Sequence, residues 1–426
     1  MMGQGGDERV LEVIRYPRLR LYTRASHYAR AGVELLSQKW RQGDSVAEFE
    51  VRVAEKLDVD YAIAMPMART GIYYAIRALV EPGKKVILSP YTISDVVNMV
   101  VCAGAVPMFA DIEQETCNID AKQVEDLIDD ETGAVLVTHF YGLTCDVERI
   151  ERVCRERDVP LIEDAAQAFG AKVAGKPAGT IGDVGIYSFG LYKNLQTFYG
   201  GMLVTRDKEV YDSVRRASAS EPYVDRTFFL KKVVQGAITD MITWPPVFSA
   251  LTRFIFRYAF LNDVSAINNR LKIDVDPKIK KIMPSEYMGR FSPLQARMAL
   301  DQLDDVERQT EERIARAQLY HEGLAGTKGI ILPPFREDRS HIYWYYPIQH
   351  AKRHELVAYA MRHGCDLAES HHRNCADLPC FQQFYRDCPN ARAAAASVVY
   401  LPTYPGYPIR DVRRNIEVIR SYLSDS

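Results

Sequence analysis

The chain has 426 residues, 47% of them hydrophobic and 26% charged, which is the composition of an ordinary globular protein large enough for more than one domain. Its formal net charge is −2 at pH 7, so no overall positive field favours binding to nucleic acid. The eight cysteines are scattered and the first ten residues, MMGQGGDERV, contain no apolar signal core. We therefore expect reduced thiols in a cytoplasmic protein that does not bind nucleic acid.

An N-terminal segment, residues 1–42, precedes the first regular pattern. In residues 43–57 apolar side chains such as Phe49 recur at helical spacing, which predicts an amphipathic helix. The pattern then predicts a short buried strand at 61–65 and a turn that leads into a helix at 67–79. A helix N-terminus at this turn favours an anion, because its free amides and its dipole are positive.

Strands and helices go on alternating as far as residue 205. Two β-rich runs, VIL and VPMF, flank a helical stretch at 95–103, and a strand that begins at Ala134 leads into a further helix before Val159. His139 follows that strand, and we favour a packed structural histidine over a general base there. The alternation predicts a mostly parallel sheet with helices on both faces.

Polar side chains end two of the apolar runs between Val159 and Thr205. The run VPLI is followed by Asp164, and the run VGIYSF contains Ser188 and precedes Lys193. Buried parallel strands deliver such residues to the carboxyl edge of the sheet, where ligands bind. A carboxylate and a lysine there suit pyridoxal phosphate, which needs an anionic partner for its ring nitrogen and an amine for its aldehyde. Taken singly, each residue is more often a surface charge, a turn or a helix cap.

The segments EDAAQAFGA, GDVGIYSF, YKNL and GGMLVT together resemble the signature of the DegT/DnrJ/EryC1/StrS family of sugar aminotransferases. The resemblance implies fold type I, with a mostly parallel seven-stranded sheet between helices and a smaller C-terminal α+β domain. It also implies that the aspartate pairs with the pyridine nitrogen, the glutamine packs near the ring, the serine binds phosphate and the lysine forms the Schiff base. In this sequence these residues are Asp164, Gln167, Ser188 and Lys193.

The sequence departs from the family at three positions around the implied phosphate. Relatives read SGT where this chain reads Ala68-Arg69-Thr70, so we expect Thr70, with charge from Arg69, to contribute. The usual aromatic ring-stacker is Ile93, which can still pack on a pyridine face. Met288 stands where relatives place an asparagine that reaches the neighbouring subunit's phosphate, although Arg290 is kept.

Residues 223–286 have no counterpart in the resemblance and form an insertion rich in aromatic and basic residues, Arg270 and Lys272 among them. Its 20 residues between Lys232 and Arg253 carry no basic side chain and are long enough to cross a bilayer at ~1.5 Å per residue. Asp240 and two prolines inside this stretch argue against a span. The favoured interpretation is extra helices packed on the enzyme or its dimer partner, and the alternative is an interfacial, membrane-docking surface.

The family pattern returns at Met288, with one long helix expected over 288–324, an aromatic-rich strand at 341–350, a strand and loop at 397–407 and a closing helix at 412–423. The cluster from Cys365 through His371, His372 and Cys375 to Cys380 lacks the paired spacing of a zinc site, so we expect no metal. The expected division is an N-terminal segment (1–42), a large cofactor-binding domain (43–222), the insertion (223–286) and a small domain (287–426).

The resemblance implies an aminotransferase that uses pyridoxal 5'-phosphate, with the pyridoxamine form as intermediate. The expected substrates are a keto-sugar, nucleotide-linked, and an amino-acid donor, glutamate, in glycan or amino-sugar biosynthesis. A lysine at 193, where dehydratase relatives have histidine, favours transamination over elimination. A homodimer is expected. The alternatives are a sugar dehydratase, an aminotransferase for a lipid-linked or membrane-associated ketone, and a non-catalytic scaffold that kept the fold.

Overall fold

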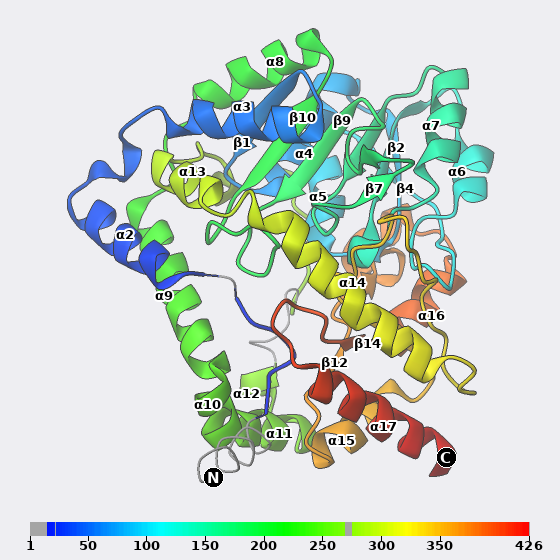
Figure 1. Ribbon diagram of the computed structural model, residues 1–426. Coiled ribbons are helices and arrows are strands. Elements are labelled where there is room, and N and C mark those ends of the chain that lie inside the picture. The colour runs from blue at the N-terminus through cyan, green and yellow to red at the C-terminus, as the bar shows by residue number, and fades with distance from the viewer. Residues whose placement is uncertain (1–14, 22, 269–274, 426) are drawn as a thin grey trace.

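The computed structural model describes residues 15–21, 23–268 and 275–425. A seven-stranded sheet in the order β1-β10-β9-β6-β5-β2-β4 lies between helices at the centre of the molecule (Figure 1). β10 runs antiparallel to β1 and β9, and the other neighbouring strands are parallel. The expected α/β fold with a mostly parallel sheet is confirmed. Its strands are β1 (Tyr61–Met65), β2 (Lys85–Leu88), β4 (Val106–Phe109), β5 (Thr132–Thr138), β6 (Leu161–Asp164), β9 (Val184–Ser188) and β10 (Gly201–Thr205).

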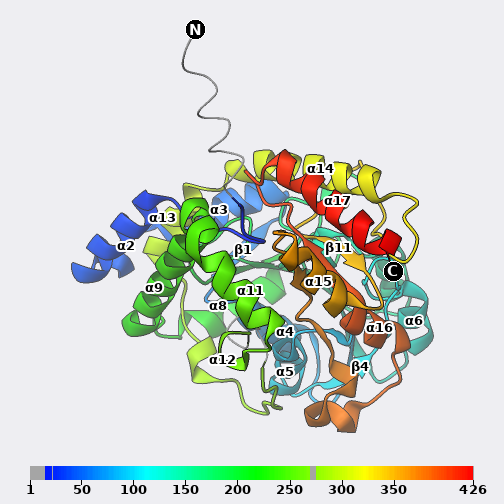
Figure 2. The same ribbon diagram turned by 90° about the horizontal axis from the view of Figure 1, so that it is seen from below.

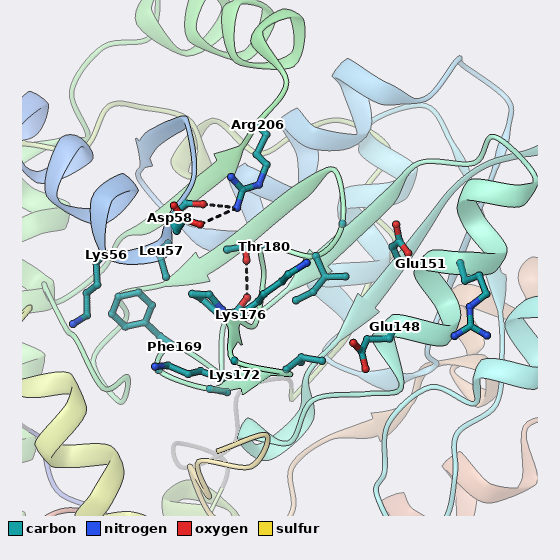
Figure 3. A pocket seen from close by; sticks show the side chains of 18 of the residues that line it. Lys56, Leu57, Asp58, Glu148, Glu151, Phe169, Lys172, Lys176, Thr180 and Arg206 are labelled. Atoms are coloured by element: carbon teal, nitrogen blue, oxygen red, sulfur yellow. Dashed lines mark hydrogen bonds and ion pairs between the residues drawn. The ribbon is translucent and has the colours of Figure 1, made fainter. Parts of the chain in front are cut away.

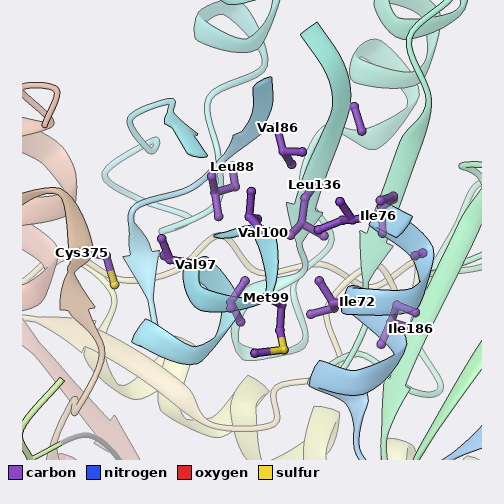
Figure 4. Close-up of a cluster of buried hydrophobic side chains, with 14 of the residues drawn as sticks. Ile72, Ile76, Val86, Leu88, Val97, Met99, Val100, Leu136, Ile186 and Cys375 are labelled. Carbon is purple, nitrogen blue, oxygen red and sulfur yellow. The ribbon is translucent and has the colours of Figure 1, made fainter. Parts of the chain in front are cut away.

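Alternating side chains of the strands enter two different hydrophobic cores. On β2, Val86 and Leu88 pack with α4, α5 and α8, whereas Ile87 packs with α6 and α7 on the opposite face. Figure 4 shows the first of these cores, in which Ile72 and Met99 meet side chains from the sheet. Both faces of the sheet are therefore apolar, because successive side chains of a strand point to opposite faces and helices cover each face. The helices of these layers are α3 (Ser45–Leu57), α4 (Ala68–Leu79), α5 (Ser94–Cys102), α6 (Ala121–Leu127), α7 (Val147–Glu156) and α8 (Lys208–Ala219).

The C-terminal part of the chain builds a second, antiparallel sheet in the order β11-β14-β12. A short clasp joins it to the large sheet, because β3 (Tyr91–Thr92) pairs with β13 (Arg373–Asn374) and Cys375 N donates to Pro90 O at 2.7 Å. Cys375 itself lies in the core of the large sheet (Figure 4). The remaining elements here are β11 (Tyr346–Gln349), α15 (Arg353–Arg362), β12 (Ala368–Glu369), α16 (Pro389–Ser397), β14 (Val398–Leu401) and α17 (Ile409–Asp425).

The single long helix expected over 288–324 is wrong, because the structure divides it into α13 (Pro293–Leu300) and α14 (Asp305–Leu324). Ser292 caps α13 in a capping box with Gln295, and a proline occupies the first turn, so the helix cannot begin earlier. α13 packs with Phe49 of α3 in the core of the large sheet. The boundary at residue 287 stays a prediction.

Residues 225–268 form a helical arm along one edge of the molecule (Figures 1 and 2). It lies within the predicted insertion, and its helicity agrees with the expectation. Arg270 and Lys272 lie outside the described residues. No helix in the described part of the chain is long and apolar enough to cross a membrane. The arm consists of α9 (Arg226–Thr243), α10 (Pro245–Val247), a π-helical turn (Phe248–Thr252), α11 (Arg253–Leu261) and α12 (Ser265–Asn268).

The arm is fixed to the body by contacts at both of its ends. α2 (Ala25–Leu36) packs against α9, and the Tyr28 hydroxyl donates to Asp240 Oδ2 at 2.6 Å. At the other end Phe260 stacks on His354 of α15, with ring centroids 4.8 Å apart. Asp240, the carboxylate that argued against a membrane span, is thus held by the protein itself.

Candidate active site

Asp164 is the last residue of β6 and lies buried at the carboxyl edge of the sheet. Register places it beside Thr138, the last residue of β5, and beside Ile186, two residues before the end of β9. Its Oδ1 accepts a hydrogen bond from Ala166 N at 3.0 Å. Burial raises the pKa of Asp164, although the Ala166 amide and the charge of Lys193 oppose the rise. The carboxylate is therefore short of compensating positive charge.

The preceding residue, Glu163, is a carboxylate with a full set of partners. It accepts hydrogen bonds from Gly179 N at 2.9 Å and from Ile181 N and Gly182 N, each at 2.6 Å. His139 Nε2 lies 2.9 Å from Glu163 Oε2, while Cys145 N donates to His139 Nδ1 at 3.3 Å. These bonds fix the orientation of the buried His139 ring at the strand ends. This agrees with the interpretation of His139 as a packed structural histidine.

Lys193 lies in the loop after β9, and its Nζ is 4.0 Å from the centroid of the Trp344 ring. Burial lowers the pKa of Lys193 to about 8, while the Asp164 charge acts in the opposite direction. The loop is held from two sides, because Trp344 Nε1 donates to Tyr192 O at 2.9 Å and Phe229 of α9 packs on Tyr199 with ring centroids 5.1 Å apart. An amine with this pKa is partly unprotonated near neutral pH, as a lysine nucleophile requires.

Ser188, Gly201 and the N-terminus of α4 meet beside this loop. Ser188 pairs with Gly201 across β9 and β10, and Gly201 also pairs with Met65 at the end of β1. A Cβ on Gly201 would lie 2.6 Å from Ala68 N, so only glycine allows this approach. No side chain caps α4, which leaves its first amides facing this point. Such amides together with a serine hydroxyl suit a phosphate.

The two side chains that the sequence offered in place of SGT point elsewhere. Arg69 forms an ion pair with Asp95 of α5 and lies over the Tyr287 ring, 4.7 Å from its centroid. Thr70 is fully buried, and its hydroxyl donates to Tyr287 O at 2.7 Å. Both residues therefore tie α4 to the segment that follows the arm. A role for Arg69 and Thr70 in phosphate binding stays a prediction. In this structure the groups of α4 that are available to a phosphate are the backbone amides of its first turn.

Ile93 caps α5 at its N-terminus and packs, half-buried, on the core of the large sheet. Gln167 lies closer to the strand ends, because its Oε1 accepts a hydrogen bond from Tyr141 N at 2.8 Å. Tyr141 holds a left-handed backbone with φ of +58°, which a bulky residue rarely adopts. Gln167 thus fixes a strained residue at the edge of the site. Contact of either side chain with a cofactor ring stays a prediction.

His371 and His372 are the residues here that sequence reasoning missed, since we treated them only as unsuitable zinc ligands. Burial lowers the pKa of His371 to about 4, and the charge of Lys193 adds to the effect; His372 shifts in the same direction. His371 Nε2 is buried and has no hydrogen-bond partner within the described residues. The pairing of β13 with β3 brings these histidines to the site, and no local motif announces such a pairing.

His372 belongs to a buried hydroxyl cluster formed by Tyr91, Tyr141, Ser370 and Tyr400. Tyr91 Oη lies 2.6 Å from Tyr141 Oη, Ser370 Oγ lies 2.7 Å from Tyr400 Oη, and His372 Nδ1 lies 2.8 Å from Tyr400 Oη. Cys365 lies in another core, so the five residues of the zinc interpretation do not converge. No group of three or more metal-ligating side chains occurs among the residues that the structure describes.

A cavity of about 940 Å³ lies apart from Lys193 and Asp164, which are not among its lining residues. It opens between α3, α7 and the hairpin of β7 (Lys172–Val173) and β8 (Lys176–Pro177), as Figure 3 shows. Arg206 bonds the carbonyl of Asp58 at its rim, and lysines and glutamates alternate around it. Mixed charge of this kind describes an open, solvated groove.

Met288 packs partly buried on the core, and Arg290 is exposed with its guanidinium 4.2 Å from the Tyr223 ring centroid. Arg290 N also donates to Pro222 O at 2.9 Å, which joins the start and the end of the insertion. Reach toward a second subunit from this segment stays a prediction.

The residues present fit pyridoxal phosphate. A buried carboxylate that lacks compensating charge suits a protonated ring nitrogen, a lysine of lowered pKa suits the aldehyde, and the meeting point of Ser188, Gly201 and α4 suits the phosphate. These three parts of the site come from the ends of β6, β9 and β10 at one edge of the sheet.

The sequence model of the DegT/DnrJ/EryC1/StrS aminotransferase family matches residues 25–232 and 270–420. Over 406 residues the chain is 28% identical to the spore coat polysaccharide biosynthesis protein SpsC of Bacillus subtilis (strain 168), with 92% of each chain covered. It is 36% identical to GDP-perosamine synthase of Escherichia coli O157:H7 over 182 residues, 42% of this chain and 50% of that one. The structure superposes on the sugar aminotransferase CalS13 of Micromonospora echinospora with a TM-score of 0.74, at 22% identity, covering 95% of this chain and 99% of that chain.

Proposed function

Because the chain belongs to the DegT/DnrJ/EryC1/StrS family of pyridoxal-phosphate-dependent aminotransferases, we propose that it transfers an amino group from glutamate to a nucleotide-linked keto-sugar. The observation that carries the proposal is the placement of Asp164 and Lys193 at one sheet edge, each shifting the pKa of the other. A carboxylate and an amine in that relation serve the two ends of one cofactor.

Bound pyridoxal phosphate would supply an electron sink for a carbanion next to the nitrogen that is transferred. Asp164 would hold the proton of the ring nitrogen, and burial strengthens that interaction because water does not screen it. Lys193 would first bind the cofactor and then, as a free amine, move a proton between the cofactor and the substrate carbon that bears the transferred nitrogen. Ser188 and the first amides of α4 would orient the phosphate.

The choice of acceptor rests on relatives. SpsC is named for polysaccharide biosynthesis and GDP-perosamine synthase for a product that is a nucleotide sugar. We infer an acceptor of the same class in amino-sugar or polysaccharide biosynthesis. Lysine at position 193 favours transamination over the elimination that a dehydratase performs.

We also propose a homodimer, with the segment around Arg290 at the contact, because Arg290 is exposed and its neighbours are fixed in place. We place the enzyme in the cytoplasm, since none of the eight cysteines, all of which the structure describes, forms a disulfide.

The test loads the purified protein with pyridoxal phosphate and follows its visible absorbance when glutamate is added. We expect a yellow protein that glutamate bleaches, and a keto-sugar nucleotide that restores the colour. Aspartate and alanine serve as competing donors. A protein that takes up no cofactor would overturn the proposal and favour the non-catalytic scaffold.

A further inference from the structure

The arm has two apolar stripes on α9, and only one of them is covered. Phe229, Val233 and Gly236 face the body and are buried. Leu230, Val234, Ile238 and Met241 recur at intervals of four, four and three residues on another side of the helix, and each is between 48% and 59% exposed. A surface helix ordinarily turns polar side chains outward.

The exposed apolar side chains continue beyond α9, past the turn that begins at Pro245. Trp244 is 54% exposed at the end of α9. Beyond it, Leu251, Phe254, Ile255 and Tyr258 recur at intervals of three, one and three residues and are between 44% and 65% exposed. These side chains, with the outward stripe of α9 and Trp244, make up what we call the outward face. Apolar side chains exposed on successive helices mark an interaction surface.

Basic residues outnumber acidic ones on the arm. Residues 225–268 contain five basic and three acidic residues, a net charge of +2. Two of the acidic side chains have partners within the protein, because Asp240 accepts a hydrogen bond from Tyr28 and Asp225 caps the N-terminus of α9. The basic ones are Arg226, Lys231, Lys232, Arg253 and Arg257.

Two of the arginines line a small cleft of about 90 Å³ between α11 and the small sheet's helices. Phe254 of the outward face lines the same cleft together with Arg15 and Asp366, whose carboxylate is paired with Arg18. Arg253 Nε is buried without a hydrogen-bond partner among the described residues. Burial lowers the pKa of Arg253, and the charges of Arg414 and Arg257 lower it further. Cations held together in this way favour an anion between them.

The charge of the arm favours one of two partners for the outward face, which are a second copy of the chain and a membrane. In a two-fold dimer the same patch lies on both sides of the contact, so basic residues would face basic residues. A bilayer with anionic lipid offers the opposite charge, and aromatic and aliphatic side chains enter its headgroup region. The family sequence model does not match residues 233–269, which contain every residue of the outward face except Leu230.

We propose that the outward face of the arm docks on the surface of a membrane that contains anionic phospholipid, with Arg253 and Arg257 binding lipid phosphate. Phe229 of α9 packs on Phe198 and Tyr199, which lie in the loop that carries Lys193. Docking therefore brings the site close to the bilayer, where a membrane-associated substrate would be found.

Flotation with vesicles of phosphatidylcholine, alone or with phosphatidylglycerol, tests the proposal at low and high salt. We expect the cofactor-loaded protein to float with the anionic vesicles at low salt and to lose most of that binding at high salt. Tryptophan fluorescence should shift to shorter wavelength on binding because of Trp244, since the other two tryptophans, Trp40 and Trp344, are buried.

Three variants make the test specific. Trp244→Ser/Leu251→Ser/Ile255→Ser should reduce vesicle binding at least tenfold, and Arg253→Gln/Arg257→Gln should remove the preference for anionic lipid. The matched control Val51→Ser/Tyr385→Ser changes side chains 55% and 49% exposed on other elements and should bind as the wild type does. Circular dichroism and cofactor absorbance show that each variant is folded.

Two results overturn the proposal. One is a wild-type protein that stays in the soluble fraction with anionic vesicles at low salt. The other is a triple variant that binds vesicles normally, or that falls from dimer to monomer in light scattering, which would assign the outward face to a second copy. Failure of docking with cofactor uptake and bleaching intact leaves the aminotransferase proposal standing.

Discussion

The sheet edge and the arm differ in where they place polar and apolar side chains. At the edge, polar side chains point inward and engage one another, as in the bonds between Glu163 and three backbone amides. On the arm, apolar side chains such as Leu251 and Tyr258 point outward. Buried polar groups cost free energy unless they are paired, and exposed apolar groups are favourable only when something covers them. The edge is thus organised around a small ligand, and the arm around a large surface.

Lys193→Ala is the change with the largest expected effect on this contrast. Without the amine, turnover should fall on the order of 10⁴-fold, because both the attachment of the cofactor and the proton transfer are lost. Borohydride reduction followed by peptide mass spectrometry measures the attachment. Lys208→Ala on α8 is the control and should behave as the wild type. Cofactor still bound covalently in the Lys193 variant would move the site elsewhere.

Asp164→Asn should lower turnover by ~10²–10³-fold, since a neutral amide cannot hold the ring nitrogen protonated. The variant should still bind the cofactor. It should also lower the pKa of Lys193 below about 8, because the Asp164 charge now raises it. Steady-state kinetics and the pH dependence of lysine attachment measure the two effects. Turnover within a few-fold of the wild type would make Asp164 a structural cap.

Phe248→Ala and Leu251→Ala compare the two sides of the arm directly. Phe248 is 1% exposed, so its truncation should lower the free energy of unfolding by ~3–5 kcal/mol. Leu251 is 58% exposed, and its truncation should change that free energy by less than ~0.5 kcal/mol. Urea denaturation measures both. Equal losses would show that the outward face contributes to folding, which the docking proposal excludes.

The smallest expected effect concerns pH. Burial lowers the pKa of Lys193 to about 8, so the unprotonated fraction falls tenfold for each pH unit below that value. The rate of cofactor attachment should follow this fraction and level off above pH 8. Trp344→Ser admits water beside the amine and should move the midpoint upward, with slower attachment at pH 7. A midpoint near 10.5 in the wild type would contradict the burial of the amine.

The sequence was sufficient for the sheet and for the strand-end residues, because parallel strands place their ends at one edge whatever the loops do. Asp164, Ser188 and Lys193 could be found in this way. The hydroxyl cluster and His371 could not, since they arrive through the pairing of β13 with β3, a contact between distant residues without a local pattern. The start of α13 had a signal, the capping box at Ser292, that we passed over.

The arm shows a different reason for failure. Its helical periodicity is clear, but α9 is apolar on two sides, so the pattern alone does not say which side faces the protein. Only the contacts of Phe229 with Trp40 and of Gly236 with Phe198 decide it. The ion pair between Arg69 and Asp95 likewise depends on α5, which no motif relates to α4.

The clasp between β3 and β13 has a consequence for folding during synthesis on the ribosome. Cys375 Sγ donates to Thr92 O at 3.6 Å across 283 residues of chain, and Cys375, Ala376 and Phe381 complete the core of the large sheet. At 5–20 residues per second, roughly 15–60 s pass between the synthesis of these partners. During that interval the nascent sheet carries an open apolar face. A premature stop after α15 would leave this face permanently uncovered, so such truncated chains should be substrates for chaperones and proteases even though every strand of the large sheet has been made.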